Sequence, residues 1–365
     1  MPIKTDAAIV FEVNQPMVID QVELDPPGEG EVLVELKAAG LCHTDLGIWE
    51  GHSPIGANLP VVLGHEGAGI VLETGPGVTD LKPGDHVITF APECQVCGAC
   101  HSTKGNFCES VLAGYGSEPS ISADKNRVFA GYGLGTFANH LVTTSSRLVS
   151  VRKDAPFDQI SYLSCGATTG LGAALVEAKV EAGSSVIVFG LGGIGLNIIQ
   201  GARIAGARMI IGVDINEDRG AMAVRLGATH FVNPRDHGDN IVGHLIELTG
   251  GGADYTFEAV GHIRLMEQAL ASARIGWGVC TIVGVAPNGE KLGVLPFDLI
   301  MGRKLQGTAM GGVRGKSQLP EFVDWLMEGR FDLKSLITAR LPLSKINEGY
   351  DVMRRGEGMR SIITF

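Results

Sequence analysis

The pattern of hydrophobic and polar positions changes near residue 166. Before it, short apolar runs such as 31–36 (EVLVEL) and 86–90 (HVITF) are separated by Gly and Pro, which is typical of short strands joined by turns. After it, the short runs 185–189 (SVIVF) and 209–213 (MIIGV) enclose a segment, 195–205, with helical apolar spacing. This alternation predicts βαβ units and therefore a parallel sheet.

The same alternation continues further along the chain and sets the expected domain boundaries. Strand-like runs lie at 254–258 and 278–285, and helix-like stretches lie at 240–248 and 265–273. The sequence therefore predicts an α/β protein with a β-rich domain at 1–166 and a nucleotide-binding domain at 167–307. The remaining segment, 308–365, is too short to stand alone, so we expect it to pack back on the first domain.

Composition narrows the class of protein. The chain has 365 residues, 45% of them hydrophobic, and 52 are Gly without a collagen period, which excludes disorder and a triple helix. The formal net charge of −11 argues against nucleic acid as a partner. No apolar run has the length of a membrane span, and the start of the chain lacks signal-peptide features. We therefore expect a cytoplasmic protein that does not associate with membranes.

A glycine motif follows the strand-like run SVIVF. Gly190, Gly192 and Gly195 form a G-x-G-x-x-G that opens the next helix, with Gly193 and Ile194 between the last two glycines. In this context the motif predicts a dinucleotide pyrophosphate at the helix start. An acid, Asp214, ends the next strand where it can bind the adenosine ribose, which favours NAD over NADP. Arg219 can flank the same ribose, and a ligand-free glycine turn is the alternative.

Four cysteines lie within fifteen residues, at Cys94, Cys97, Cys100 and Cys108. Four thiolates at this spacing can surround one Zn²⁺ and leave no position for substrate, so this site is expected to be structural. An iron–sulfur cluster is the alternative, although the spacing differs from that of ferredoxins.

Two further cysteines stand apart, Cys42 in LCHTD and Cys165 in SCGATT, and GHE lies between them with His65 and Glu66. Each residue alone is weak evidence, because isolated cysteines are usually small buried hydrophobes. Together with a nucleotide-binding domain they suggest a Cys2His zinc site with an open fourth position, which is the catalytic type. The seventh cysteine, Cys280, lies in an apolar run and is expected in the core.

These motifs together resemble those of the zinc-dependent medium-chain alcohol dehydrogenases, nearest their long-loop, two-zinc members. GLCHTD, GHEGAG, the four-cysteine segment, SCGATTGLGA, GLGGIG, VDIN and MRSIITF occur in the family's order. The resemblance implies a GroES-like catalytic domain, a Rossmann NAD-binding domain and an active site between them. It implies that Cys42, His65 and Cys165 bind a catalytic zinc, with Glu66 as a transient ligand and Asp45 orienting His65.

The resemblance also implies a route for the proton and for cofactor binding. Thr44 would pass the proton of the alcohol to the cofactor ribose, while His43, Thr169 and Arg360 match cofactor-binding positions. Many relatives end this relay at a His or Tyr five residues after the first zinc cysteine, but Gly47 stands there. The final proton acceptor is therefore unassigned, with His52 or ordered water as candidates.

The substrate expectation rests on two features. Relatives that oxidise a glutathione adduct of formaldehyde carry an Arg shortly after the fourth structural cysteine, and 109–112 (ESVL) has none. Four apolar or aromatic residues match the substrate pocket: Trp49, Ile55, Phe90 and Tyr132. We therefore expect a hydrophobic primary alcohol of aryl, allylic or medium-chain type, interconverted with its aldehyde.

Other readings remain open from the sequence. The first alternative substrate is a formaldehyde adduct of glutathione or mycothiol, and a non-catalytic cofactor-sensing protein is a third hypothesis. The segment between Cys108 and Phe137 resembles the long loop of dimeric members, so a homodimer is expected, with a tetramer as the alternative.

Overall fold

The structure is a computed structural model, and it describes residues 2–52, 58–91, 93–109, 128–131 and 134–365. The chain divides into two compact units, the first made of 1–165 and 314–365 and the second of 166–313. From the sequence we expected boundaries after 166 and 307. Each unit is described here by itself.

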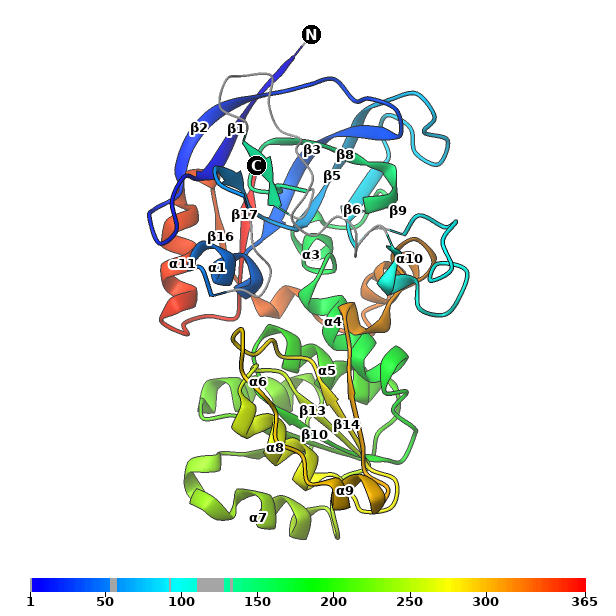
Figure 1. Cartoon of the computed structure of the whole chain (residues 1–365), viewed down its shortest axis with the longest axis vertical. Coiled ribbons are helices and arrows are strands. Elements are labelled where there is room, and N and C mark those ends of the chain that lie inside the picture. The colour runs from blue at the N-terminus through cyan, green and yellow to red at the C-terminus, as the bar shows by residue number, and fades with distance from the viewer. Residues whose placement is uncertain (1, 53–57, 92, 110–127, 132–133) are drawn as a thin grey trace. The chain divides into compact units, whose positions relative to one another are not determined.

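The first unit is built mainly from two β-sheets (Figure 1). The larger sheet has seven strands: β16 (Ile337–Leu341), β17 (Arg360–Thr364), β3 (Glu31–Gly40), β5 (Glu66–Thr74), β6 (His86–Thr89) and β9 (Leu148–Val151) in that order, with β8 (His140–Thr144) also paired to β3. The smaller sheet orders β2 (Val18–Leu24), β1 (Ile3–Val10), β4 (Val61–Val62) and β7 (Phe129–Ala130).

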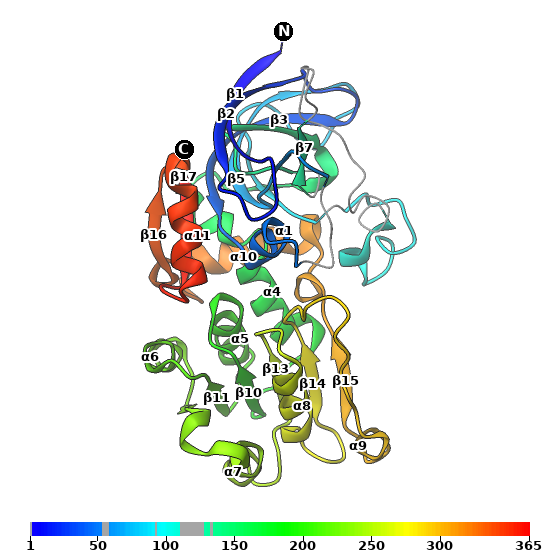
Figure 2. The ribbon, with the colours of Figure 1, turned by 60° about the vertical axis from the view of Figure 1, so that its left-hand side comes forward.

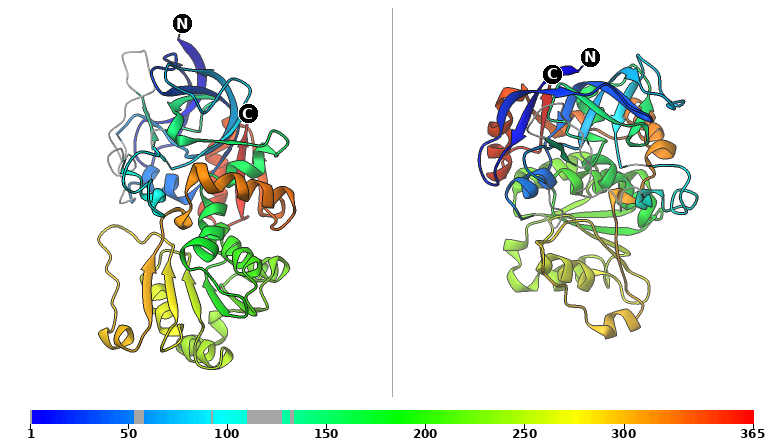
Figure 3. Two further views of the ribbon diagram at one scale, coloured as in Figure 1. Left: turned by 90° about the vertical axis from the view of Figure 1, so that its right-hand side faces the viewer. Right: turned by 45° about the horizontal axis from the view of Figure 1, so that its top comes forward.

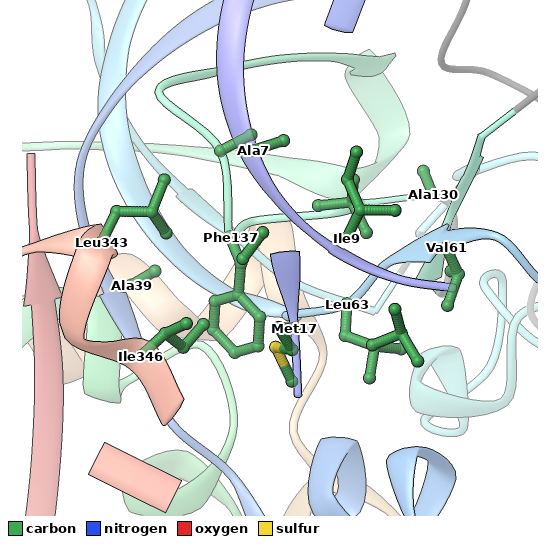
Figure 4. Packing of buried hydrophobic residues seen from close by; sticks show 14 of the residues in the cluster. Ala7, Ile9, Met17, Ala39, Val61, Leu63, Ala130, Phe137, Leu343 and Ile346 are labelled. Atoms are coloured by element: carbon green, nitrogen blue, oxygen red, sulfur yellow. The ribbon is translucent and has the colours of Figure 1, made fainter. Parts of the chain in front are cut away.

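A hydrophobic core links β1, the chain from β4 to Leu63 and the C-terminal helix of this unit. Figure 4 shows Phe137 at its centre, with Leu63, Met17 and Ile346 around it. Phe137 and Leu63 are fully buried. Burial of such side chains contributes about 1.5–3 kcal/mol each relative to exposure, so this core fixes the chain just before His65.

The C-terminal segment belongs to the first unit and completes its larger sheet. It contains α10 (Gly315–Met327), β16, α11 (Ile346–Arg354) and β17, and Figure 2 shows β16, α11 and β17 together in red. Strand β17 runs antiparallel to β3, with Ile363 opposite Ala39. Both chain termini therefore lie in this unit, as Figure 3 shows.

Two short helices of the first unit position site residues. Helix α1 (His43–Trp49) begins directly after Cys42, which is its N-cap residue. Helix α3 (Phe157–Tyr162) precedes Cys165, and the Ser164 N–H still donates to the Ser161 carbonyl at 3.1 Å.

The second unit is a six-stranded parallel sheet with helices. The strand order is β12 (His230–Val232), β11 (Met209–Val213), β10 (Ser185–Phe189), β13 (Tyr255–Glu258), β14 (Val279–Ile282) and β15 (Lys304–Gly307). Its helices are α4 (Gly166–Gly172), α5 (Gly193–Ile204), α6 (Glu217–Leu226), α7 (Ile241–Leu248), α8 (Ile263–Ser272) and α9 (Pro296–Ile300). The predicted βαβ unit around the glycine motif is β10–α5–β11, and all strand pairs of this sheet are parallel. Within the described ranges, no helix is both long enough and apolar enough to span a bilayer.

Candidate metal and cofactor sites

Four predicted site residues converge within the first unit. Cys42 precedes α1, His65 precedes β5, Glu66 begins β5, and Cys165 follows α3. Their ligand atoms all lie within 4.8 Å of one another. The polypeptide therefore brings together two sulfurs, an imidazole and a carboxylate from three distant segments.

Asp45 holds the imidazole ring of His65 in place. It is completely buried, its Oδ2 lies 3.0 Å from His65 Nδ1, and its Oδ1 accepts the Gly64 N–H at 3.0 Å. Because Nδ1 contacts Asp45, Nε2 is the nitrogen that would bind a metal. Burial alone would lower the pKa of His65, but the charges of Asp45 and Cys42 raise it well above its usual value.

Arg360 and Glu66 form a second charged pair at this site. Arg360 Nη1 contacts both carboxylate oxygens of Glu66, at 3.1 and 3.2 Å, and also donates to the Leu41 carbonyl. Its guanidinium lies over the Tyr162 ring at 4.2 Å. Burial raises the pKa of Glu66 to about 8, against the opposing charge of Arg360. Arg360 is thus fixed against Glu66, and its contact with a cofactor stays a prediction.

The donor set fits a catalytic zinc ion. Cys42 is almost fully buried, and its pKa is lowered well below the ordinary thiol value by the hydrogen bond from Cys165, with the charge of His65 acting in the same direction against burial. Thiolate and imidazole are preferred ligands of Zn²⁺, and three protein ligands leave one position for a substrate. Cys42, His65 and Cys165 would hold the ion, with Glu66 at its edge.

The four clustered cysteines form a second donor set. The Sγ atoms of Cys94 and Cys100 lie 3.9 Å apart, and those of Cys97 and Cys108 lie 4.0 Å apart. Backbone N–H groups of Glu109 and Cys100 lower the pKa of Cys97 to about 6, which favours a thiolate. Four sulfurs fit a structural zinc site. Cys280 lies apart from both sets, buried in the core of the second unit.

The glycine motif opens α5 at the end of β10. Gly190 has φ +89°, and a Cβ on Gly195 would lie 1.8 Å from the Gly190 carbonyl oxygen. A Cβ on Gly192 would meet nothing within 4 Å. The first and third glycines are therefore required by the turn and its packing, whereas the second leaves open space where a phosphate can approach the helix start.

Asp214 connects the end of β11 to this loop. Its Oδ2 accepts the Leu191 N–H at 2.7 Å, and its Oδ1 accepts the Asn216 N–H at 2.9 Å. Arg219 Nη1 lies 3.9 Å from Asp214 Oδ2. The acid is thus fixed beside the glycine loop, as a ribose-binding role requires. Sequence reasoning gave Asp214 this role but did not reveal its bond to Leu191.

The remaining predicted cofactor and relay residues are divided between the units. Thr169 lies buried in α4 of the second unit, whereas His43 is exposed at the start of α1 in the first. Thr44 lies in α1 with its Oγ1 3.6 Å from Cys42 Sγ, close to the metal ligands. Their contacts with a shared cofactor stay predictions.

Of the predicted pocket residues, Trp49 and Phe90 lie within the described part of the chain. Trp49 is only 3% exposed, donates its indole N–H to the Gln15 carbonyl at 2.6 Å and packs edge-on against Tyr350. Trp49 thus belongs to the hydrophobic core of the first unit, and its pocket role stays a prediction. Phe90 is also buried, and its pocket role stays a prediction. Ile55 and Tyr132 lie outside the described residues.

Sequence reasoning missed two buried hydroxyls beside the metal ligands, Thr89 and Ser164. Thr89 Oγ1 accepts the Gly67 N–H at 2.8 Å, and Ser164 Oγ donates to the Gly67 carbonyl at 3.0 Å. Their neighbours Phe90 and Cys165 were singled out, but a hydroxyl next to a motif residue carries no signal of its own in a sequence.

Two family models match the chain. Residues 28–153 match the alcohol dehydrogenase GroES-like domain, and residues 193–328 match the zinc-binding dehydrogenase family. The S-(hydroxymethyl)glutathione dehydrogenase of Paracoccus denitrificans is 46% identical over 376 aligned residues, covering 99% of this chain and 100% of the relative.

Solved structures extend the likeness to the fold. An alcohol dehydrogenase zinc-binding domain protein from Burkholderia ambifaria matches with a TM-score of 0.94 at 32% identity, covering 100% of both chains. Benzyl alcohol dehydrogenase from Acinetobacter calcoaceticus matches with a TM-score of 0.92 at 30% identity, covering 100% of this chain and 99% of that one. The expected fold class, a GroES-like domain with a Rossmann-type parallel sheet, is confirmed.

The expectation of a hydrophobic primary alcohol as substrate is wrong. The relative at 46% identity is an S-(hydroxymethyl)glutathione dehydrogenase, and a second at 46% is an alcohol dehydrogenase class-3 from Cereibacter sphaeroides, whereas the benzyl alcohol enzyme is only 30% identical. The expectation failed because apolar residues that seemed to line a pocket, such as Trp49, can equally form the core.

The four cysteines lie within the matched alcohol dehydrogenase domain, and their donor set favours zinc over an iron–sulfur cluster. The family matches also favour an enzyme over a non-catalytic protein. The chain belongs to the zinc-dependent medium-chain alcohol dehydrogenase family, as an oxidoreductase with NAD and two zinc ions per chain, one catalytic and one structural.

Proposed function

We propose that this enzyme oxidises the S-hydroxymethyl adduct formed by formaldehyde and a small thiol such as glutathione. The observation that carries the proposal is the 46% identity, over the whole chain, to an S-(hydroxymethyl)glutathione dehydrogenase. When bound, NAD would supply the hydride acceptor for this oxidation, and the hydroxyl of the adduct would lose its proton. The products are an S-formyl thiol, NADH and H⁺.

The residues of the first unit would prepare the hydroxyl for oxidation. Cys42, His65 and Cys165 hold the metal, which when bound lowers the pKa of a hydroxyl and polarises a carbonyl. Asp45 fixes the ring of His65 through the 3.0 Å contact with Nδ1. Thr44, whose hydroxyl both accepts and donates, would receive the substrate proton and pass it to the cofactor ribose, as the family resemblance implies.

The residues of the second unit would bind NAD. The N–H groups at the start of α5 would bind the pyrophosphate, for which the open space at Gly192 leaves room. The Asp214 carboxylate, held by Leu191 and Asn216, accepts a ribose hydroxyl and repels a 2′-phosphate. This arrangement supports NAD rather than NADP.

Steady-state kinetics test the proposal. The kcat/KM for formaldehyde with glutathione, followed as NADH formation, is compared with kcat/KM for benzyl alcohol and with formaldehyde alone. We expect the thiol adduct to exceed both, and NAD to exceed NADP. The formaldehyde adduct of mycothiol is measured as well, because 109–112 lacks the Arg that relatives use for the glutathione carboxylate. A higher kcat/KM for benzyl alcohol than for both thiol adducts would contradict the proposal.

We also propose a homodimer located in the cytoplasm. Strand β15 ends the order of the parallel sheet, and the preceding segment exposes Leu295, Phe297 and Ile300 by 70%, 66% and 76%. Such apolar exposure beside a strand edge supports pairing with a second copy. Light scattering of the wild type and of Ile300→Glu tests this, and a wild type that stays monomeric at micromolar concentration contradicts it. None of the seven cysteines forms a disulfide, which supports a reducing compartment such as the cytoplasm. Cell fractionation tests this location, and recovery of the protein outside the cytoplasmic fraction would contradict it.

A further inference from the structure

Thr89 makes contacts that extend an unfinished strand pairing. Strands β5 and β6 pair antiparallel with Ala68 opposite Ile88, so the next pair in register is Gly67 with Thr89. At this pair a side chain provides the hydrogen bond in place of a backbone carbonyl, because Thr89 Oγ1 accepts the Gly67 N–H at 2.8 Å. The pairing of β5 therefore continues by one residue toward the metal ligands.

The same hydroxyl contacts the peptide groups on both sides of Glu66. Thr89 Oγ1 also donates to the His65 carbonyl at 3.0 Å, while the Gly67 N–H lies on the other side of Glu66. One hydroxyl thus fixes both peptide groups that flank Glu66. Because the directions of the His65 and Glu66 side chains follow from these two peptide groups, Thr89 sets how both enter the site.

Ser164 makes the matching connection from the other ligand segment. Its Oγ donates to the Gly67 carbonyl at 3.0 Å and lies 3.4 Å from Thr89 Oγ1. Ser164 directly precedes Cys165 and is 1% exposed. The segment carrying Cys165 is thereby tied to the segment carrying His65 through atoms that are not themselves metal ligands.

The close packing around Thr89 and Gly67 leaves little space for another arrangement of these two residues. Thr89 is 1% exposed, and a Cβ on Gly67 would lie 2.8 Å from Thr136 Cγ2 and 3.1 Å from Leu36 Cδ2. With one proton on each hydroxyl, Thr89 donates to His65 and Ser164 donates to Gly67, so each proton has a partner. Buried hydrogen bonds of this kind stabilise the geometry they define.

We propose that Thr89 and Ser164 are positioning residues that preorganise the catalytic zinc site by locking the His65–Gly67 segment to Cys165. The inference rests on the proposed metal site and adds two residues to it. Groups that orient metal ligands typically change metal affinity 10- to 100-fold when removed. The four-cysteine site shares no contact with this pair among the described residues, so it provides an internal reference.

The test combines Thr89→Val with Ser164→Ala in the full chain. Valine keeps the shape of threonine and removes its hydroxyl, and Thr256→Val is the matched control, because Thr256 is fully buried and donates to the Ala269 carbonyl at 2.9 Å in the second unit. Zinc release to a chelator is followed per site, beside circular dichroism. Cobalt-substituted protein reports the ligand geometry through its visible spectrum.

We expect the double variant to release one zinc about 10- to 100-fold faster than wild type, to release the second at the wild-type rate, and to show an altered cobalt spectrum. Thr256→Val should release both zinc ions at wild-type rates. Thr89→Ser, with Ser164 unchanged, keeps the hydroxyl and should therefore also release both ions slowly. Wild-type release of both ions, or loss of both together with the fold, would overturn the inference. The site itself is tested separately, because Cys42→Ser should lower zinc from two ions to one.

Discussion

Replacing Gly195 by Ala tests the packing argument for the dinucleotide loop. The new Cβ would lie 1.8 Å from the Gly190 carbonyl oxygen and 2.9 Å from its carbonyl carbon. Both are backbone atoms, so no side-chain rotation can relieve the clash, and α5 must shift by about 1.7 Å or more to reach ordinary van der Waals distance. Overpacking of this kind lowers the free energy of unfolding by about 1–3 kcal/mol.

The same shift moves the N–H groups at the start of α5 away from the pyrophosphate. Loss of a charge-assisted hydrogen bond costs about 1.5–3 kcal/mol, which corresponds to a rise of about 10- to 100-fold in the Kd for NAD. Urea unfolding measures the first effect, and calorimetric titration of zinc-loaded protein with NAD measures the second.

Gly192→Ala is the matched comparison. Gly192 has φ −76°, and its Cβ would meet nothing within 4 Å. We expect the free energy of unfolding to change by less than about 1 kcal/mol, while NAD binds more weakly because the methyl group occupies the space of the phosphates. The reasoning is refuted if Gly195→Ala keeps wild-type stability and affinity, or if Gly192→Ala destabilises the fold as much as Gly195→Ala.

Three further predictions follow from the site and the fold. Thr44→Ala should lower kcat about 100-fold or more if Thr44 relays the proton, whereas His52→Gln should change it little, and near-wild-type turnover of Thr44→Ala would contradict the relay. Chelation of the catalytic zinc should abolish NADH formation while circular dichroism persists, and re-addition of zinc should restore activity; activity that survives removal would exclude a catalytic metal. Burial alone would raise the pKa of Asp254, but hydrogen bonds from Ser185 and Trp277 lower it below its usual value. The ionised carboxylate therefore stabilises the folded protein above a pH of about 3.9, the pKa of an unfolded Asp. This contribution is lost as the pH falls through the lower pKa of the folded state. Asp254→Asn should therefore be less stable than wild type near neutral pH, with the gap closing in acid, and a gap independent of pH would contradict this.

The sequence predicted those parts of the molecule in which a particular residue type is required. The glycine loop needs Gly190 and Gly195 because their positions exclude a Cβ, and a metal needs sulfur and imidazole, so both left a readable pattern. The βαβ alternation of the second unit was readable for the same reason, since a buried parallel strand requires an apolar run.

The sequence could not reveal what depends on tertiary register. Thr89 and Ser164 gain their roles from the pairing of β5 with β6 and from the turn after α3, and the same hydroxyls elsewhere would be ordinary. Trp49 illustrates the converse, because an aromatic residue near a motif can face a pocket or the core, and only its bond to Gln15 places it in the core. The wrong substrate expectation has this same origin.

The central claim is that Cys42, His65 and Cys165 together bind a catalytic zinc. A crystal of the zinc-loaded protein, measured above and below the zinc absorption edge, tests it most directly. We expect two anomalous peaks per chain, one among the four clustered cysteines and one within about 2.3 Å of the Cys42 and Cys165 sulfurs. A single peak at the four cysteines, with density absent beside His65, would contradict it.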